Sequence, residues 1–476
     1  MTRPQFTALI VASALFMEQV DATVIATALP AIAVDLAVDP IALKLAFTAY
    51  LLGLAIFIPA SGWAADRFGA RAVFSSAIVV FTIGSICSGF SSTLEQFVAA
   101  RVLQGVGGAM MTPVGRLVVI RSAPRSELVS LMAWLTVPSL LGPMMGPPLG
   151  GFIVTFFDWR WIFWINVPVG IVGFILARLF VPDFRAEDPG RFDALGFVLL
   201  GTGLSGLVFG LSVFGQAFVP FWVSLALLAA GAVCTTLYVG HARRSTSRPL
   251  LDLALFQYRT LFTGVVGGFL FRIGIGAIPF LLPLMLQIGL GLTAFETGML
   301  TFAGAGGALL MKFTAAPIVR RVGFKPVLVV NGVLSAGFIA VTGLFIYGVP
   351  HYVIVVVLLT AGFFRSLQFT CLNALTYADV PDDQTSRATS LSSVSQQLAL
   401  STGVAVAAFI LEVLRSRNGD HTIALTDYLT AFLILGAISL VPVLTYLRLP
   451  ADAGASMSGR RRRAPPAESD ASEGGA

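Results

Sequence analysis

The sequence predicts an all-α polytopic membrane protein, and three observations support this class. The 476 residues are 57% hydrophobic and only 11% charged, with a mean hydropathy of +0.89. A soluble domain carries about a quarter of charged residues, so water cannot be the main solvent of this surface. The 48 glycines lie mostly inside apolar runs, where they let helices pack closely in lipid. Apolar runs long enough to cross a bilayer recur along the chain.

About fourteen apolar runs reach the roughly 20 residues that cross a bilayer as a helix. They cover residues 6–30, 43–62, 73–90, 97–119, 131–156, 161–181, 194–213, 221–240, 261–287, 297–317, 327–347, 352–375, 391–413 and 428–447. An even number of spans places both termini on the same side of the membrane.

The basic residues predict which side that is. Most of the 30 Lys and Arg residues fall on the side of the N-terminus, including Arg67, Arg71, Arg121, Arg125, Arg243, Arg244, Arg320, Arg321 and the run Arg460 to Arg463. The opposite side holds Lys44, Arg160, Arg415 and Arg417. Because cytoplasmic loops carry the excess of Lys and Arg, both termini are expected in the cytoplasm of a bacterial-type inner membrane.

A faint internal repeat predicts the domain organisation. The segment Asp66-Arg-Phe-Gly-Ala-Arg71 has a degraded echo in Arg320-Arg-Val-Gly-Phe-Lys325. We therefore expect two six-helix halves, at residues 1–192 and 261–449. Two inserted helices are expected at residues 193–240, followed by a cytoplasmic linker at residues 241–260. The tail, residues 450–476, is rich in Arg, Pro, Ser and Gly and is expected to be disordered.

Several classes of protein are disfavoured by what the chain contains. Cys87, Cys234 and Cys371 are far apart inside apolar runs, which predicts neither a disulfide framework nor a metal site. The sequence has no phosphate-binding Gly-x4-Gly-Lys-Ser/Thr run and no His-Glu-x-x-His run. The net charge of +6 comes from short clusters between apolar runs, so no nucleic-acid partner is expected. We expect no enzyme activity and no cofactor.

The first predicted span contains two carboxylates, Glu18 and Asp21. Their spacing of three places them on one helix face, where each ionised form is costly in a bilayer. Such a pair exchanges protons as a coupled unit, as a proton carrier must. The alternative is a carboxylate satisfied by a packing partner at a helix end. Arg101 in the fourth span needs a carboxylate or water, and Asp21 is the expected partner.

Arg272 and Arg365 are isolated cations in the ninth and twelfth spans. Each costs roughly 3 kcal/mol at mid-bilayer unless it is paired, so both should face the interior. They could hold an anionic substrate or form fixed ion pairs with Glu412 or another acid, and both alternatives stay open. Arg272 is favoured for substrate, because the glycines and proline that follow it leave backbone open beside a cavity. Arg116 and Lys312 lie near span ends and are expected to snorkel.

The fifth span combines prolines, which kink a helix, with glycines, which let a neighbouring backbone approach closely. This chemistry predicts a kinked hinge, made of Gly142, Pro143, Gly146, Pro147, Gly150 and Gly151.

With these motifs in view, nearly the whole chain resembles the major facilitator superfamily. It is most similar to the fourteen-helix drug:proton antiporters of the EmrB and QacA type, and within them to the MdtD-like group. The segments that carry the resemblance are Asp21 to Pro30, Gly62-Trp-Ala-Ala-Asp66-Arg67-Phe-Gly69-Ala-Arg71, Arg101 to Ala109, Gly142 to Gly151, Trp159 to Gly170, Arg191-Phe-Asp193 and Arg272 to Phe280.

The resemblance implies a major facilitator fold and a secondary active transporter. Such a protein exports drugs or other small amphipathic molecules by alternating access, driven by the proton gradient. It also implies proton coupling by Asp21 and Arg101, to which the residues add Glu18, and a cytoplasmic gate of Gly62, Asp66, Arg67, Gly69 and Arg71. The expected partners are a small-molecule substrate, protons and the lipid bilayer. A monomer is expected, and a periplasmic adaptor by analogy with EmrB is left open.

Two departures from the family pattern keep other functions open. Arg320 stands where the second-half echo of Asp66 would be, and Arg365 lies in a helix that commonly has only small residues there. The first alternative is an exporter of a small organic anion, a carboxylate, bound by Arg272 and Arg365. The second is a membrane sensor or enzyme without transport, which the absence of a soluble domain disfavours.

Overall fold

The computed structural model describes residues 2–122, 128–186, 190–214, 219–244, 249–345, 347–381, 384–416, 423–450 and 452–454. Arg125, Arg417, the run Arg460 to Arg463 and nearly all of the expected tail lie outside these residues, so the predictions for them are not tested.

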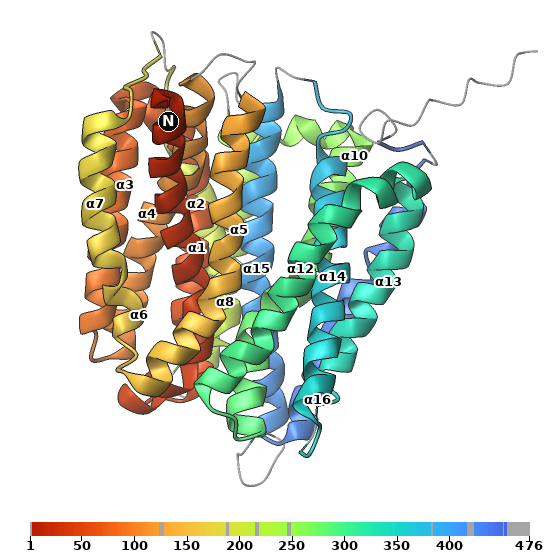
Figure 1. The fold of residues 1–476 in the computed structure, drawn as a ribbon. Coiled ribbons are helices and arrows are strands. Elements are labelled where there is room, and N and C mark those ends of the chain that lie inside the picture. The colour runs from red at the N-terminus through yellow and green to blue at the C-terminus, as the bar shows by residue number, and fades with distance from the viewer. Residues whose placement is uncertain are drawn as a thin grey trace, which may run out of the picture.

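Long helices make up the described chain (Figure 1). The first group contains α1 (Arg3–Asp35), α2 (Lys44–Phe68), α3 (Ala70–Phe90), α4 (Leu94–Arg121), α5 (Leu128–Phe156), α6 (Trp161–Trp164) and α7 (Asn166–Phe180). Two helices follow, α8 (Ala194–Val213) and α9 (Phe221–Arg244). The second group contains α10 (Arg259–Phe262), α11 (Gly268–Leu284), α12 (Ala294–Val322), α13 (Phe324–Thr342), α14 (His351–Thr376), α15 (Thr385–Arg415), α16 (Leu425–Leu440) and α17 (Val443–Leu447).

Short helical segments extend these elements. Two are 3-10 turns, η1 (Pro40–Leu43) before α2 and η2 (Leu253–Gln257) before α10. Two are π-helical and flank α11, namely η3 (Thr263–Gly267) and η4 (Met285–Gly289). Within the described residues, 13 helical stretches are long and apolar enough to cross a membrane, and α5 is a further helix of 29 residues. The predicted class, an all-α polytopic membrane protein, is confirmed.

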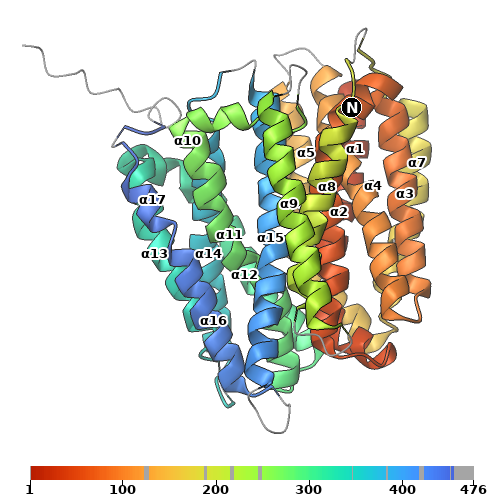
Figure 2. The ribbon, with the colours of Figure 1, turned by 180° about the vertical axis from the view of Figure 1, so that it is seen from behind.

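Both described ends of the chain lie at one face of the helix bundle. Helix α1 begins and α17 ends at the upper face in Figures 1 and 2. We call this the terminal face and the other one the opposite face. The described stretches 66–71 and 320–325, together with the end of α9, lie at the terminal face, whereas α2 and α12 begin at the opposite face.

The two helix groups contact each other mainly through two pairs of helices. Helix α5 packs against α12, and α2 packs against α15. Helix α8 contacts both α2 and α15, and α9 packs on α8, so this pair covers the contact between α2 and α15 from outside (Figure 2).

Polar contacts join the groups near the opposite face. The Phe295 amide donates to Thr155 Oγ1 at 3.0 Å, Gln287 Nε2 donates to the Thr27 carbonyl at 3.1 Å, and Arg415 pairs with Asp39. Helices α5 and α12 lie side by side there and separate toward the terminal face (Figure 1). Helices α5 and α12 therefore hold the groups together at the opposite face and lie apart at the terminal face.

The internal sequence repeat corresponds to a repeated backbone turn. Gly69 has φ of +95° where α2 ends and α3 begins, and Gly323 has φ of +91° where α12 ends and α13 begins. Glycine reaches this left-handed region without the steric cost that a Cβ atom brings. The echo in the sequence thus preserves the turn although it lacks the acidic residue.

Candidate functional site

Asp21 on α1 and Arg101 on α4 form an ion pair in the interior of the first helix group. Arg101 Nη1 lies 2.7 Å from Asp21 Oδ2 and also donates to Gln104 Oε1 at 2.6 Å. The two charged side chains are 0% and 1% exposed. The Arg101 guanidinium lies over the Tyr50 ring, 4.4 Å from its centroid. The predicted pairing of Arg101 with Asp21 is confirmed.

The second oxygen of Asp21 accepts two amide donors. Gln104 Nε2 donates to Asp21 Oδ1 at 2.8 Å, and Asn166 Nδ2 on α7 donates to it at 2.9 Å. Asn166 Nδ2 also donates to Ser85 Oγ on α3 at 3.0 Å. We call Asp21, Arg101, Gln104, Asn166 and Ser85 the Asp21 cluster. It ties four helices together and satisfies both oxygens of the buried carboxylate.

Glycines on α4 allow this close approach. A Cβ atom on Gly105 would lie 2.5 Å from the Tyr50 carbonyl oxygen, and one on Gly107 would lie 2.5 Å from the Phe81 amide nitrogen. Neither position accommodates a side chain without moving a neighbouring backbone. The small residues of the fourth-span motif thus bring α4 against α2 and α3, which places Arg101 within reach of α1.

Glu18 lies one helical turn before Asp21 and has different surroundings. Its side chain is 4% exposed, and Thr112 Oγ1 on α4 donates to its Oε2 at 2.9 Å. Within the described chain, no Lys or Arg forms a salt bridge with it. The two carboxylates therefore face α4 as expected, but only Asp21 has a cationic partner.

The glycines of the predicted hinge lie against α1. Gly142, Gly146 and Gly150 share one face of α5, and a Cβ on Gly146 would lie 2.0 Å from Thr23 Oγ1. Gly151 faces the second helix group instead, where its Cβ would lie 2.3 Å from the Ala294 carbonyl oxygen. The prolines Pro143 and Pro147 line a cavity. The segment is a close contact between three helices, and its role as a hinge stays a prediction.

The residues of the predicted gate lie at the terminal face. Asp66 lies 3.4 Å from Arg121 Nη2, and Arg71 Nε donates to the Val181 carbonyl at 2.5 Å. A Cβ on Gly69 would lie 2.5 Å from an Asp183 carboxylate oxygen, so the turn is closely packed. Two further gate residues, Gly62 and Arg67, are exposed in this structure.

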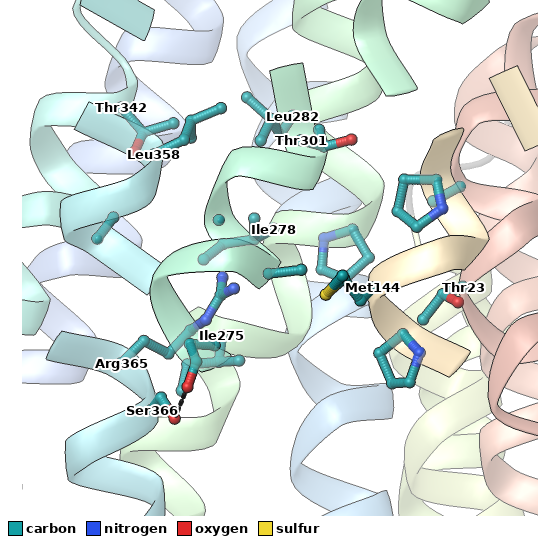
Figure 3. Close-up of a pocket in the computed structure, with 18 of the residues that line it drawn as sticks. Thr23, Met144, Ile275, Ile278, Leu282, Thr301, Thr342, Leu358, Arg365 and Ser366 are labelled. Atoms are coloured by element: carbon teal, nitrogen blue, oxygen red, sulfur yellow. Dashed lines mark hydrogen bonds between the residues drawn. The ribbon is translucent and has the colours of Figure 1, made fainter. Parts of the chain in front are cut away.

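A cavity of about 420 Å³ lies between the two helix groups. Its walls come from α1 and α5 on one side and from α11, α12, α13 and α14 on the other. Most of the lining is apolar, with Thr23 and Met144 facing Ile275, Ile278 and Leu282 (Figure 3). Thr23 is two residues from Asp21, so α1 connects the Asp21 cluster to the cavity.

Two cationic side chains line this cavity. Arg365 on α14 is half-buried, extends toward Ile278 (Figure 3) and has no hydrogen bond or ion pair with any described residue. Lys312 on α12 donates to Thr370 Oγ1 at 3.0 Å. Among the described residues, no Asp or Glu lines the cavity. Its electrostatic character is therefore positive.

Arg272 does not lie where it was expected. It is 0% exposed, it is absent from the cavity wall, and its Nη2 donates to Asn373 Oδ1 at 2.9 Å. Phe271 and Ile275 line the cavity, so helical periodicity turns the intervening Arg272 toward α14. Of the two arginines, Arg365 is the one beside the cavity.

The expected ion pair with Glu412 is also not seen. Glu412 lies 3.7 Å from Arg415 Nη2, and neither Arg272 nor Arg365 forms a salt bridge with a described acid. Lys312 lines the cavity, and its interpretation as a snorkelling residue stays a prediction. The predicted span ended at residue 317, but α12 continues to Val322, which leaves Lys312 about three turns inside the helix.

Sequence reasoning missed three polar side chains of the site. Asn166 belongs to the segment Trp159 to Gly170, which was used only for the family resemblance. An amide side chain inside an apolar run could have indicated that it bonds to a buried polar group. Ser85 and Thr112 gave no such signal, because hydroxyls in helices commonly bond to their own backbone. The described residues contain no group of three or more His, Cys, Asp or Glu that could hold a metal ion.

Comparison with known proteins identifies relatives over most of the chain. The family model "Major Facilitator Superfamily" matches residues 11–240 and 264–471. A protein of Klebsiella pneumoniae subsp. pneumoniae named "Putative multidrug resistance protein MdtD" is 40% identical over 459 residues, which cover 95% of this chain and 96% of the relative. Its namesake in Salmonella paratyphi A is 38% identical over 460 residues, covering 95% and 97%. Among solved structures, the POT family transporter PepTSo has a TM-score of 0.67 at 14% identity, covering 96% of this chain and 99% of that one.

Proposed function

Since the chain belongs to the major facilitator superfamily and is a multi-pass secondary transporter, we propose that it exports small amphipathic molecules by proton-coupled antiport. In this proposal, residues 1–192 and 261–449 form two halves that alternate access to the cavity between them, with α8 and α9 inserted. The name of the Klebsiella relative refers to multidrug resistance, which supports export as the direction of transport.

The observation that carries the proposal is the contrast between the two buried carboxylates on α1. Protonation of Asp21 would cost it the Arg101 ion pair, whereas Glu18 has one hydroxyl donor and no cation to lose. We therefore expect Glu18 to exchange the proton more readily and Asp21 to respond through its cluster. Tyr50, Arg101 and Arg116 are the other titratable or charged groups that face this pair from α2 and α4.

A route from the carboxylates to the substrate follows from the packing of α1. Thr23 lines the cavity, and its hydroxyl lies against Gly146 of α5 without room for a methyl group. A shift of α1 that follows a change at Asp21 must therefore move α5, which also contacts α12 at Gly151. Protonation and the contact between the two halves would be coupled in this way.

The distribution of basic residues supports a cytoplasmic terminal face. Arg67, Arg71, Arg121, Arg243, Arg244, Arg320, Arg321 and Lys325 lie at that face, against Lys44, Arg160 and Arg415 at the opposite one. In this orientation the described contacts close the periplasmic side, so the cavity would take its substrate from the cytoplasm.

The experiment is transport in proteoliposomes with an imposed pH gradient, screened over cationic dyes and carboxylates, with a pH-sensitive dye in the lumen. Wild-type protein should move substrate only with the gradient and should move protons in the opposite direction. Glu18→Gln and Asp21→Asn should stop gradient-driven transport, whereas Asp158→Asn, at an exposed position on the opposite face, should not. Substrate movement by wild-type protein that ignores the pH gradient would reject proton coupling.

A further inference from the structure

We propose that the cavity between the helix groups binds an amphipathic organic anion, with the acid group on Arg365 and the hydrocarbon body against the apolar walls. The proposal deepens the export function above and rests on it for direction and energy. The binding itself requires no proton gradient, so the two can be tested separately.

The Arg365 guanidinium lacks hydrogen-bond acceptors in the described part of the chain. A guanidinium has five N–H donors, and burial of a charge without hydrogen-bond partners is costly. Arg272, one helix away, donates to Asn373 Oδ1 and to the Gly264 carbonyl, and only its buried Nε has no hydrogen-bond partner among the described residues. Arg365 has no such partner among the described residues, and its side chain extends into the cavity (Figure 3). A bound anion would supply the missing acceptors.

The space around Arg365 is open because its neighbours are small. A Cβ added to Gly304 of α12 would lie 3.8 Å from Arg365 Nη2, and Ala308 and Ala361 line the same part of the wall. A planar carboxylate or sulfonate can therefore approach the two-pronged face of the guanidinium.

The other charge on the described cavity wall is also positive. Lys312 lines the same cavity from α12, and one of its three donors is used by Thr370. No described acid lines the cavity, so a cationic drug would meet two like charges and no carboxylate to pair with. The same two charges attract an anion that enters from the terminal face. Lys312 lies closer to that face along α12 than Gly304 does.

The rest of the cavity wall is largely apolar. Met144, Ile278, Leu282, Phe338, Leu358 and Phe369 are among the lining residues, and the cavity of about 420 Å³ is within the size range of sites for drug-sized ligands. A small hydrophilic acid would leave these surfaces wet. The ligand class is therefore one acid group on an aromatic or branched aliphatic body.

The test uses three probes with the same naphthalene body and different charge: 2-naphthoate, 2-naphthylmethylammonium and 2-naphthalenemethanol. Binding to the full-length purified protein in nanodiscs is measured by calorimetry at constant pH. We expect naphthoate to bind at least about tenfold more tightly than the other two, and acetate, which lacks the body, to bind at least about tenfold more weakly than naphthoate. Equal binding of the three naphthalene probes, or tighter binding of the cation, overturns the proposal.

Variants assign the effect to Arg365. Arg365→Gln should weaken naphthoate binding about ten- to a hundredfold and leave binding of the alcohol unchanged. Arg365→Lys should retain part of the naphthoate affinity that Arg365→Gln loses. Lys312→Gln should weaken naphthoate binding less than Arg365→Gln does. Arg178→Gln, an exposed arginine of α7 outside the cavity, is the matched control and should change nothing. A variant at Arg365 that is folded and binds naphthoate like wild type, or one that loses the alcohol equally, contradicts the assignment. If Arg365→Gln does not fold, the probe series on wild-type protein still decides the charge preference. Naphthoate binding without proton-coupled transport would reject the export mechanism alone.

Discussion

Arg101 on α4 and Arg365 on α14 are both arginines in long apolar helices. Of these two, Arg101 has an acidic partner among the described residues and Arg365 has none. Arg101 is 1% exposed and bonds to Asp21 and Gln104, within a cluster that links four helices. Arg365 is half-buried, lines the cavity and bonds to no described residue. The two arginines look alike in the sequence, because each is one cation in an apolar run.

The surroundings of an intramembrane charge distinguish its possible roles. A charge whose donors and acceptors are satisfied inside the protein holds helices together or couples them to a proton. A charge that is left open in a cavity is available to a ligand. The two helix groups differ in this way: the described charges of the Asp21 cluster form an ion pair with each other, whereas those of the cavity wall have no described acid beside them.

The largest effect should separate the two arginines by stability. Arg101→Leu leaves the Asp21 carboxylate buried without its cation, and removal of one partner of such a pair costs about 3–5 kcal/mol. Arg365→Leu removes a charge without a described partner, so it should leave the thermal midpoint unchanged or raise it. Thermal unfolding of both variants in the same detergent checks this. An equal loss of stability in both would erase the distinction between a satisfied and an open charge.

The next effect should separate the two carboxylates. Asp21→Asn keeps the side-chain shape but loses charge-assisted hydrogen bonds, worth about 2–3 kcal/mol, and should stop gradient-driven export while substrate binding persists. Glu18→Gln should stop it with little change in stability, because only the Thr112 hydroxyl is bonded to Glu18. Unfolding curves and proton flux measured on the same preparations test the pair. Unchanged proton-driven transport in either variant would remove that carboxylate from the coupling mechanism.

A smaller effect is expected at Asn166, which no motif-based argument assigned a role. Asn166→Ala removes the donor to Asp21 and to Ser85, at a cost of about 1–2 kcal/mol. Because Asp21 keeps Arg101 and Gln104, coupling should be weakened and not lost. Proton flux per substrate molecule and the unfolding midpoint are the two measurements. Wild-type values of both would mean that Asn166 does not contribute to holding Asp21 in place.

At the terminal-face turn, we expect an effect on stability no larger than that at Asn166 and no effect on ligand affinity. Gly69→Ala places a Cβ about 2.5 Å from an Asp183 oxygen at φ of +95°, a strain of roughly 1–2 kcal/mol. Turnover should slow, and naphthoate affinity should stay the same, since Gly69 lies away from the cavity. Gly62→Ala, at an exposed position of α2 with no neighbour within 4 Å of the added Cβ, is the comparison for local strain. Lost affinity at normal turnover would instead connect this turn to the binding site.

The all-α membrane class, the approximate helical spans and the pairing of Arg101 with Asp21 could be predicted from the amino-acid sequence. These follow from local properties: apolar runs of bilayer length, and the need of a buried cation for one of the few acids in the same region. The glycines of α4 and α5 were also readable, because only close packing accounts for so many small residues in apolar helices. The placement of the termini, the division into halves and the roles of the gate stay predictions.

Which of the isolated cations lines the cavity could be seen only in the packed structure. Arg272 and Arg365 have similar apolar neighbours in the sequence, but the rotation of α11 turns Arg272 toward Asn373, whereas α14 presents Arg365 to the space beside α12. The structure also brought Asn166 and Ser85 to Asp21 from helices far away in the chain. Helix rotation and the choice of partner depend on how all the helices pack at once, and a periodicity read along one helix does not contain that information.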